Sequence, residues 1–304
     1  MIIDMHTHLS DLRVYPDYWI QNIKENMALQ FQKQMGYSVQ DSFVQMYINN
    51  VLSDYECERK IKVMDECGVN KCVVLQADFG YGKKAKCSIE EITEIHYEAL
   101  KRYADRFIVF SGIDPRRGEA GVKLFRKSIE QYHFSGFKVY PPCGFEIDDE
   151  RLFPYYEICD HYRLPALIHI GESWKSMKTV FNYPESILRA TDRFPNIPFI
   201  LGHAAFLFYE DSFEVAANRE NVYLEVSGYQ KMMDKEEILL EHMKREMCEI
   251  SDKIVFGSDW PMYYSLSEDI AYFNEMDFLT QEQKDKFFSK NAQQILEKQN
   301  DFKI

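Results

Sequence analysis

The segment IIDMHTH at residues 2–8 is a short apolar run with β-branched residues that ends in two histidines, His6 and His8. A run of this kind predicts a buried β-strand. Similar segments follow along the chain: KCVVLQA (71–77), FIVFSGI (107–113), GFKVYP (136–141), PALIHIG (165–171), PFILGHA (198–204), VYLEVSG (222–228) and KIVFGSD (253–259). Their near-continuous apolar character is typical of parallel strands that are buried on both faces.

Charged stretches with helical spacing of their apolar residues separate most of these segments, as at 89–106 and 151–163. This alternation predicts βα units and a parallel sheet. Eight such units in 304 residues predict an α/β fold, a (β/α)8 TIM barrel that forms one domain over residues 1–304. An open doubly wound sheet is the alternative, although the G-x-G-x-x-G turn of dinucleotide-binding folds is absent after the first segment.

A long insertion at about 11–50 follows the first predicted strand. Connections of this type usually have ~2–6 residues, so we expect the insertion to have a role of its own. Its Tyr, Phe and Trp content argues against disorder. We expect short helices over the C-terminal face of the barrel, which form either a lid or pocket wall, or a structural pad or contact between subunits. A homodimer is therefore one expectation.

The composition restricts the partners that the protein can have. The net charge of −13 disfavours nucleic acid but leaves a small-molecule substrate open, even an anionic one. Seven scattered cysteines without C-x-x-C spacing predict free thiols in a reducing compartment. There is no signal-peptide pattern and no apolar run of ~18 residues, so we expect a cytoplasmic protein without a membrane partner.

Potential metal ligands stand at the ends of four predicted strands, namely His6, His8, His169, His203 and Asp259. The carboxyl ends of barrel strands meet at one mouth, where active sites are built. Because side chains at positions i and i+2 share a face, we expect His6 and His8 to point into the barrel together. Asp4 has the same parity and is expected deeper on that side, where it would support the ligands or make buried hydrogen bonds. Imidazoles and a carboxylate suit one divalent ion, zinc first, with manganese or iron as alternatives.

The chain resembles the amidohydrolase superfamily, and within it the branch that includes aminocarboxymuconate-semialdehyde decarboxylase. The resemblance extends over the whole predicted barrel and is carried by IIDMHTH (2–8), GFKVYPP (136–142), ALIHIG (166–171), ILGHA (200–204) and IVFGSDWP (254–261). It implies that His6, His8, His169 and Asp259 bind one metal ion. It also implies that His203 is the general acid/base beside the ion, or a ligand of a second ion.

Lys138, on the fourth predicted strand, has two interpretations. In some members of the superfamily a carboxylated lysine on this strand bridges two metals, whereas the branch that this chain resembles has a mononuclear site. We expect an unmodified Lys138 that binds a substrate carboxylate, with the bridging carbamate as the alternative. Tyr140 has the same parity and would lie nearer the mouth. Trp174, in the loop after the fifth strand, is predicted to face the substrate, with a packed position in a surface loop as the alternative.

The predicted site favours a metal-dependent hydrolase that uses a metal-activated water on a small amide, ester or lactone, with catalytic roles for His203 and Asp259. The first alternative is a non-oxidative decarboxylase or hydratase of a carboxylated unsaturated or aromatic acid. Basic residues at the mouth would favour that alternative, namely Lys138, Lys175, Arg116 and Arg117. The second alternative is a non-catalytic metal-binding scaffold, which His203 disfavours because it accompanies the ligands.

Overall fold

The computed structural model describes every residue except 172, 174–176, 178–182, 229–236, 263–264 and 298–304. Its centre is a set of short parallel strands: β1 (Ile3–Thr7), β2 (Lys71–Leu75), β3 (Phe107–Phe110), β4 (Phe137–Val139), β5 (Ala166–His169), β6 (Phe199–Gly202), β7 (Val222–Glu225) and β8 (Ile254–Val255).

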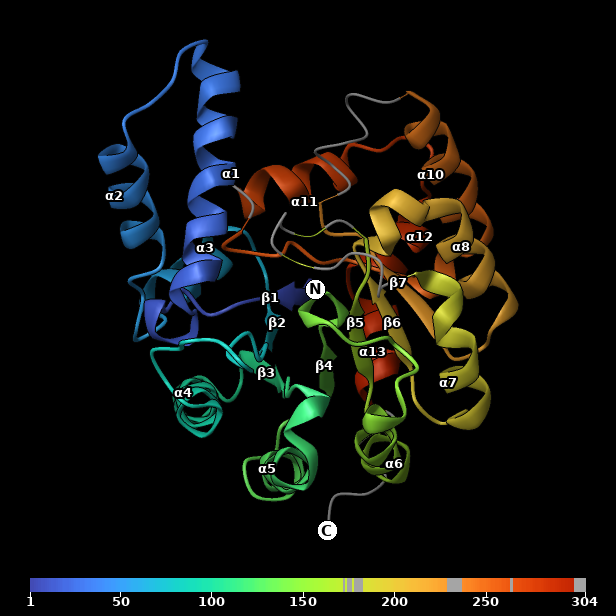
Figure 1. Ribbon diagram of the computed structural model, residues 1–304. Coiled ribbons are helices and arrows are strands. Elements are labelled where there is room, and N and C mark those ends of the chain that lie inside the picture. Colours follow the sequence, from blue (N-terminus) through green and yellow to red (C-terminus); the bar gives the residue numbers. More distant parts are fainter. Residues whose placement is uncertain (172, 174–176, 178–182, 229–236, 263–264, 298–304) are drawn as a thin grey trace.

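Helices surround these strands (Figure 1). They are α1 (Asp17–Met35), α2 (Asp41–Val51), α3 (Glu58–Glu66), α4 (Ile89–Arg102), α5 (Gly118–Glu130), α6 (Phe153–Tyr162), α7 (Leu188–Arg193), α8 (Tyr209–Asn218), α10 (Glu237–Glu249), α11 (Leu266–Asn274), α12 (Gln281–Asp285) and α13 (Asn291–Glu297). Within the described part of the chain, no helix combines the length and the apolar character needed to cross a membrane.

The strands close into a barrel. One sheet has the order β1-β2-β3 and the other the order β4-β5-β6-β7-β8. Isolated parallel bridges join the two sheets at both seams, between Ser111 and Phe137 and between Thr7 and Trp260. The amide of Met5 also donates a hydrogen bond to the carbonyl of Phe256, over 2.9 Å. The (β/α)8 prediction is therefore confirmed, and the open doubly wound sheet is excluded.

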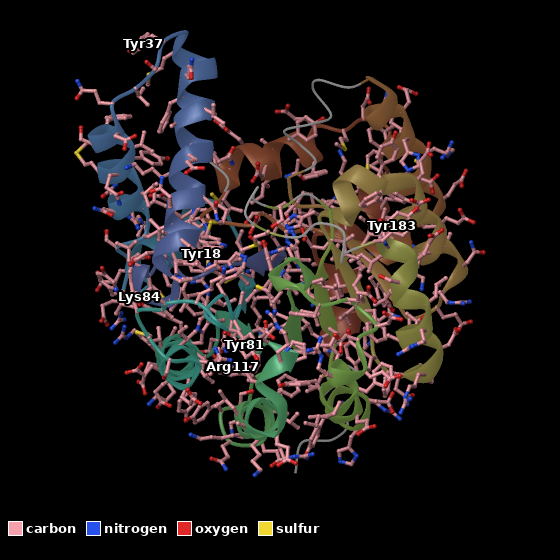
Figure 2. All side chains as sticks on the ribbon, viewed as in Figure 1. Tyr18, Tyr37, Tyr81, Lys84, Arg117 and Tyr183 are labelled. Carbon is pink, nitrogen blue, oxygen red and sulfur yellow. The ribbon has the colours of Figure 1, made fainter. Side chains whose placement is uncertain are left out.

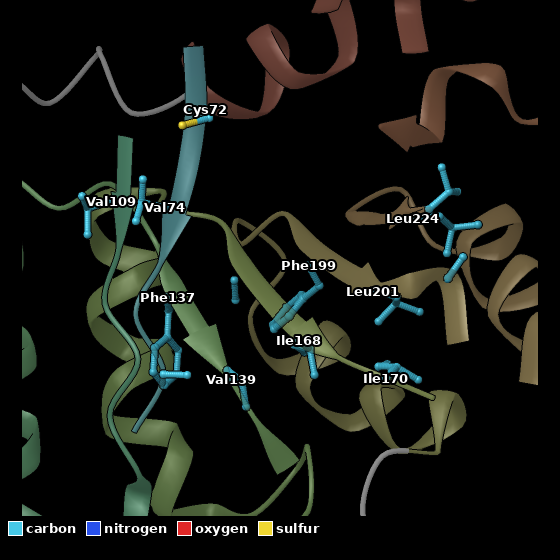
Figure 3. Close-up of a cluster of buried hydrophobic side chains, with 14 of the residues drawn as sticks. Cys72, Val74, Val109, Phe137, Val139, Ile168, Ile170, Phe199, Leu201 and Leu224 are labelled. Carbon is cyan, nitrogen blue, oxygen red and sulfur yellow. The ribbon is translucent and has the colours of Figure 1, made fainter. Parts of the chain in front are cut away.

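Side chains alternate between two apolar layers along each strand. Phe137 and Val139 of β4 belong to the large layer between strands and helices (Figure 3). A smaller cluster fills the barrel interior and contains Ile3, Met5, Val73, Leu75, Phe110, Leu167, Ile200, Tyr223 and Val255. Because Lys138 lies between Phe137 and Val139, its side chain points inward. His169 and Glu225 follow interior residues by two positions, so they also face inward.

An irregularity in β1 changes the direction of its side chains. Ile3 and Met5 both belong to the interior cluster, so Asp4 between them points outward. The register of β1 against β2 then shifts between Asp4 and Thr7. A bulge of this kind reverses the alternation, and His6 and His8 are thereby directed to the centre of the mouth.

The prediction that Asp4 shares the inward face of His6 and His8 is therefore wrong, whereas its expected buried hydrogen-bonding role is confirmed. Its carboxylate instead accepts hydrogen bonds from the Ser258 hydroxyl (2.6 Å), the Ser258 amide (3.0 Å) and the His6 amide (3.1 Å). Burial raises the pKa of Asp4 to about 6, against the effect of these hydrogen bonds. Asp4 thus connects the end of β1 to the loop after β8 from the outer side.

The insertion forms a helical hairpin. Helix α1 has 19 residues, longer than the short helices that we expected, and α2 has 11. The two helices lie side by side and extend beyond the barrel at the upper left, with Tyr37 near their connecting turn (Figures 1 and 2). The far part of this hairpin exposes large apolar side chains, namely Leu29, Met35, Tyr37, Phe43 and Met46.

The base of the hairpin reaches the barrel mouth through aromatic contacts. The Trp19 ring stacks on Phe79, with 5.0 Å between the ring centroids. Phe79 then packs edge-on against Tyr140 at 4.9 Å, and the Tyr140 ring lies 4.4 Å from the His169 ring. The first turns of α1 therefore form part of a continuous aromatic row that ends at a predicted metal ligand. This arrangement supports the pocket-wall interpretation for the base of the insertion.

Candidate metal centre

Three predicted ligands lie together at the carboxyl ends of β1 and β8. Asp259 Oδ1 is 3.1 Å from His8 Nε2 and 3.5 Å from His6 Nε2. All three side chains are buried, and their potential ligand atoms lie within 4.8 Å of one another. The barrel topology thus brings together groups from the first and the last strand, as predicted.

The chemistry of these atoms fits a divalent cation. His8 Nδ1 lies 3.0 Å from the Leu75 carbonyl oxygen, which can only accept, so Nδ1 carries the hydrogen and Nε2 keeps its lone pair. Asp259 Oδ1 is buried and has no hydrogen-bond partner among the described residues. A buried carboxylate oxygen is costly to leave in this state. A cation held by His6, His8 and Asp259 would remove that cost.

Glu225 is a site residue that the sequence analysis missed. It ends β7, is fully buried, and its Oε2 lies 2.5 Å from His6 Nδ1. Glu225 also accepts hydrogen bonds from the amide of Ser227 (2.5 Å) and the amide of His203 (3.3 Å). A carboxyl group behind an imidazole fixes the ring orientation, and in its ionised form it makes the opposite nitrogen a better metal ligand. The available signal was one acidic residue inside the apolar segment VYLEVSG.

The electrostatics of the Glu225–His6 pair follow from burial. Burial raises the pKa of Glu225 to about 8, although hydrogen bonds from Ser227 and His203 oppose this shift. Burial, together with the nearby Lys138 charge, lowers the pKa of His6 well below its usual value. His6 is therefore neutral at pH 7, which is the state that a metal ligand requires. His6, His203 and Glu225 also form a second group of potential ligand atoms within 4.8 Å.

His169 and His203 face each other from the ends of β5 and β6. His203 Nε2 lies 3.1 Å from His169 Nδ1, and His203 Nδ1 lies 2.9 Å from Ser227 Oγ and 3.2 Å from the Ser227 carbonyl oxygen. The carbonyl only accepts, and the Ser227 hydroxyl donates its hydrogen to Glu225 Oε2 over 3.0 Å. His203 therefore carries its hydrogen on Nδ1 and accepts from His169 through Nε2. His169 Nε2 is then unprotonated. The ligand role of His169 stays a prediction, since His169 lies outside both groups of clustered ligand atoms.

His203 is a neutral imidazole held in a strained position. Burial lowers its pKa to about 4, against the opposing effect of Asp259. At pH 7 it can therefore accept a proton before it donates one. His203 and Asp259 both have left-handed backbone conformations, with φ of 60° and 56°. Each costs ~1–3 kcal/mol in a residue other than glycine, and such strain is concentrated at functional sites.

Lys138 lies inside the same site. Its side chain is 2% exposed, and Nζ is 3.4 Å from His6 Nε2. Burial lowers its pKa to about 8, while the Asp259 and Glu225 carboxylates oppose this effect. The Tyr140 hydroxyl lies 3.1 Å from Ser173 Oγ, so Tyr140 is near the mouth as expected. Trp174 and Lys175 are outside the described residues.

The two arginines that we placed at the mouth are already engaged. Arg116 binds Asp114 with Nε and Nη2, at 2.8 and 2.5 Å, and Arg117 binds Asp78 in the same two-pronged way. Both aspartates are buried. These pairs neutralise the guanidinium charges and fix the loops after β2 and β3. Among the described basic residues suggested for the mouth, Lys138 is the one without a carboxylate ion pair, so the expected help of Arg116 and Arg117 in anion binding is not supported.

Metal removal should reveal the centre directly. We expect about one tightly bound divalent ion per chain in purified protein, and a lower unfolding temperature after chelation. Restoring the ion at about 1,000 times its Kd should return ~4 kcal/mol of stability, because only the folded chain presents the assembled ligands. Elemental analysis and calorimetry measure both quantities. If the purified protein contains no metal and chelators leave its unfolding temperature unchanged, the metal centre is ruled out.

A substitution at Gly257 tests whether Glu225 orients the His6 imidazole. A Cβ atom at residue 257 would lie 2.2 Å from Glu225 Oε1. We expect Gly257→Ala to push the carboxylate away from His6 and to weaken Mn²⁺ binding by about 10–100-fold. Titration of metal-free protein with Mn²⁺ measures this. Adding Glu225→Asp shortens the acid and should recover part of the affinity; unchanged affinity in Gly257→Ala alone would refute the coupling.

Comparison with known proteins adds independent findings. A family model described as amidohydrolase matches residues 3–298. The crystal structure of an uncharacterised TIM-barrel protein from Bordetella bronchiseptica is similar, with 18% identity, a TM-score of 0.73, and 98% of this chain and 99% of that chain covered. The 4-oxalomesaconate hydratase of Rhodopseudomonas palustris has 19% identity and a TM-score of 0.61, with 99% and 97% covered.

A further similar structure is the 5-carboxyvanillate decarboxylase of Novosphingobium aromaticivorans, crystallised with bound manganese. It has 17% identity and a TM-score of 0.66, with 98% of this chain and 97% of that chain covered. Identities at this level show a shared fold alone. No curated protein sequence matches the chain significantly.

Proposed function

The chain belongs to the amidohydrolase family, and on this premise we propose that it is a metal-dependent, non-oxidative decarboxylase of a carboxylated aromatic or unsaturated acid. One observation carries the proposal. The lysine amine of Lys138 is 3.4 Å from His6 Nε2, so a buried cation adjoins the predicted metal position. A site that holds a cation beside a metal suits a substrate with two acidic oxygens, one for each.

The walls of the site support the same substrate class. The Phe79, Tyr140 and His169 rings form one continuous surface, with centroid separations of 4.9 and 4.4 Å. Aromatic rings pack well against a planar conjugated substrate. Similar structures include a decarboxylase of an aromatic acid and a hydratase of an unsaturated acid.

The roles of the residues follow from their protonation states. His6, His8 and Asp259 would hold a divalent ion, with His169 as a further ligand, and the bound ion would supply a Lewis acid for a substrate oxygen. Lys138 binds and orients the carboxylate that leaves as carbon dioxide. The bond to that carboxylate breaks, and its electron pair stays on the ring carbon. His203 accepts a proton and returns it to this carbon, so one proton from solvent is consumed in each turnover.

Hydrolysis of a small amide, ester or lactone is the second candidate. Its support is the buried Oδ1 atom of Asp259, which has no hydrogen-bond partner among the described residues. A carboxylate in that state can accept the proton of an attacking water. His203 would then donate to the leaving group after taking up a proton. The same groups would serve a hydratase, which adds water across a double bond.

We further propose that the bound ion is zinc or manganese. Nitrogen-rich ligand sets favour zinc, and a structure of similar fold contains manganese. We also propose that the protein acts in the cytoplasm on a small molecule. The exposed apolar side chains of the α1–α2 hairpin favour a homodimer, since apolar surfaces of this kind mark interaction sites.

Substrate screening separates these candidates. In one assay, metal-loaded protein is incubated with carboxylated aromatic and unsaturated acids, and released carbon dioxide is measured. In the other, it is incubated with lactones, esters and amides, and released acid is measured. Carbon dioxide is the expected product. Lys138→Met should lower kcat/KM by about 10–100-fold, the size of a lost hydrogen bond to a charged group. Lys84→Met, on an exposed surface lysine (Figure 2), is the control. Release of acid without carbon dioxide would contradict the decarboxylase proposal and support the hydrolase.

A further inference from the structure

Lys60 is a buried lysine that the proposed reaction does not use. It belongs to α3, which packs outside the barrel (Figure 1), and it is 2% exposed. Its Nζ donates a hydrogen bond to the His8 carbonyl oxygen over 3.2 Å. The same amine lies 4.7 Å from the centroid of the Trp260 ring and 5.9 Å from that of Phe107.

Those contacts involve the two segments that carry the clustered ligands. His8 is a ligand candidate at the end of β1, and Trp260 directly follows Asp259 after β8. The segments also bind each other, because the His8 amide donates to the Trp260 carbonyl (2.8 Å) and the Asp259 amide donates to the His6 carbonyl (2.7 Å). Lys60 is therefore a further connection between them, made by a side chain from outside the barrel.

The backbone around Lys60 is fixed as well. Asp54 accepts hydrogen bonds from the amides of Arg59 (3.1 Å) and Lys60 (2.8 Å), at the start of α3. The lysine stem therefore begins from a held position, and its amine ends between a carbonyl and an aromatic face. An ammonium attracts both groups, the carbonyl by hydrogen bonding and the ring by its negative face.

We propose that Lys60 is a positioning residue of the metal centre. Its amine bridges the His8 carbonyl oxygen and the Trp260 ring. This bridge sets the separation between the His8 imidazole and the Asp259 carboxylate. The inference rests on the predicted metal centre. It assigns Lys60 no contact with substrate or metal. Its effect is on metal affinity, through the geometry of two ligands.

Lys60→Met removes the donor to the buried His8 carbonyl, and a buried acceptor left without its partner lowers the stability of the fold. A merely structural role for Lys60 therefore predicts a lower unfolding temperature of the metal-free variant, with an unchanged metal affinity of the folded protein. If Lys60 positions ligands, the same variant should bind metal more weakly, because loss of a group that orients a ligand typically lowers affinity by about 10–100-fold.

The experiment titrates Mn²⁺ into metal-free wild type and variants, and follows metal-free unfolding by calorimetry. Lys60→Met is expected to weaken Mn²⁺ binding by about 10–100-fold, and Lys60→Arg, which keeps charge and donors, to restore most of the affinity. Lys62→Met, on an exposed lysine of the same helix, should bind as wild type does. Trp260→Leu removes the aromatic face and should also weaken binding.

The outcomes distinguish the inference from the metal centre itself. Wild-type protein without Mn²⁺ affinity would refute the centre, and the inference with it. If wild type binds Mn²⁺ and either folded variant, Lys60→Met or Trp260→Leu, binds it equally well, the positioning role is wrong and the centre stands. Weaker binding in both folded variants, with recovery in Lys60→Arg and wild-type affinity in Lys62→Met, supports the role.

Discussion

Asp259→Asn is expected to abolish turnover and to leave the fold intact. The substitution keeps the shape of the side chain, so the contacts of the β8 loop can persist. It removes the negative charge at Oδ1, which lies 3.1 Å from His8 Nε2 and 3.5 Å from His6 Nε2. Loss of a metal ligand and proton acceptor should lower kcat/KM by at least about 10³-fold, within the range for acid–base groups.

The measurement needs a substrate from the screen, saturating metal, and circular dichroism to confirm the fold. Asp277→Asn provides a matched control on an exposed aspartate outside the site. Metal titration of the variant separates the two contributions: a weaker Kd reports the ligand role, and a loss of rate at saturating metal reports proton transfer. A wild-type Kd for the metal, together with wild-type turnover at saturating metal, would show that Asp259 has neither role.

His203→Asn should lower kcat by about 10²–10⁴-fold, the usual contribution of a general acid–base group. The His203 ring nitrogen Nε2 lies 3.1 Å from His169 Nδ1, and the asparagine amide cannot exchange a proton there near pH 7. Metal affinity should change little when the ion is held by His6, His8 and Asp259, because His203 belongs to the other group of potential ligand atoms, with His6 and Glu225.

The pKa of His203 also predicts how the activity depends on pH. Because burial lowers the pKa of His203 to about 4, the wild-type imidazole stays neutral from pH 7 down to that value. The activity that depends on its neutral form is therefore retained above about pH 4 and lost below it. His161→Asn, on an exposed histidine of α6, is the control. Full activity of His203→Asn would remove its catalytic role, and a large loss of metal affinity would instead make it a ligand.

The barrel could be predicted because its signal is repeated. Each strand is a short buried run, and alternating helices leave few topologies for a parallel sheet. The family resemblance rested on strand-end segments, and the match over residues 3–298 confirms it. His6, His8 and Asp259 could be placed together because strand ends in a barrel share one face. That rule needs the topology and no detailed coordinates.

Other parts of the site depend on local irregularity. Asp4 was misplaced because the bulge in β1 reverses the two-residue alternation, and nothing in IIDMHTH marks it. Glu225 was missed because a single acid in an apolar strand has no periodic pattern. The pairing of Arg116 and Arg117 with buried aspartates depends on how the loops after β2 and β3 fold. Such pairing decides whether a positive charge is available, and spacing alone does not reveal it.

The closure of the barrel by β1 and β8 has a consequence for biosynthesis. His6 leaves the ribosome early, and Asp259 only when most of the chain has been made, so a nascent chain cannot hold the ion in its final ligand set. Until β8 is translated, one edge of β1 lacks the partners that Phe256 and Trp260 provide. Exposed strand edges promote aggregation. A chain terminated before residue 254 should therefore depend on chaperones while it is ribosome-bound, and it should lack the ligand set that Asp259 completes.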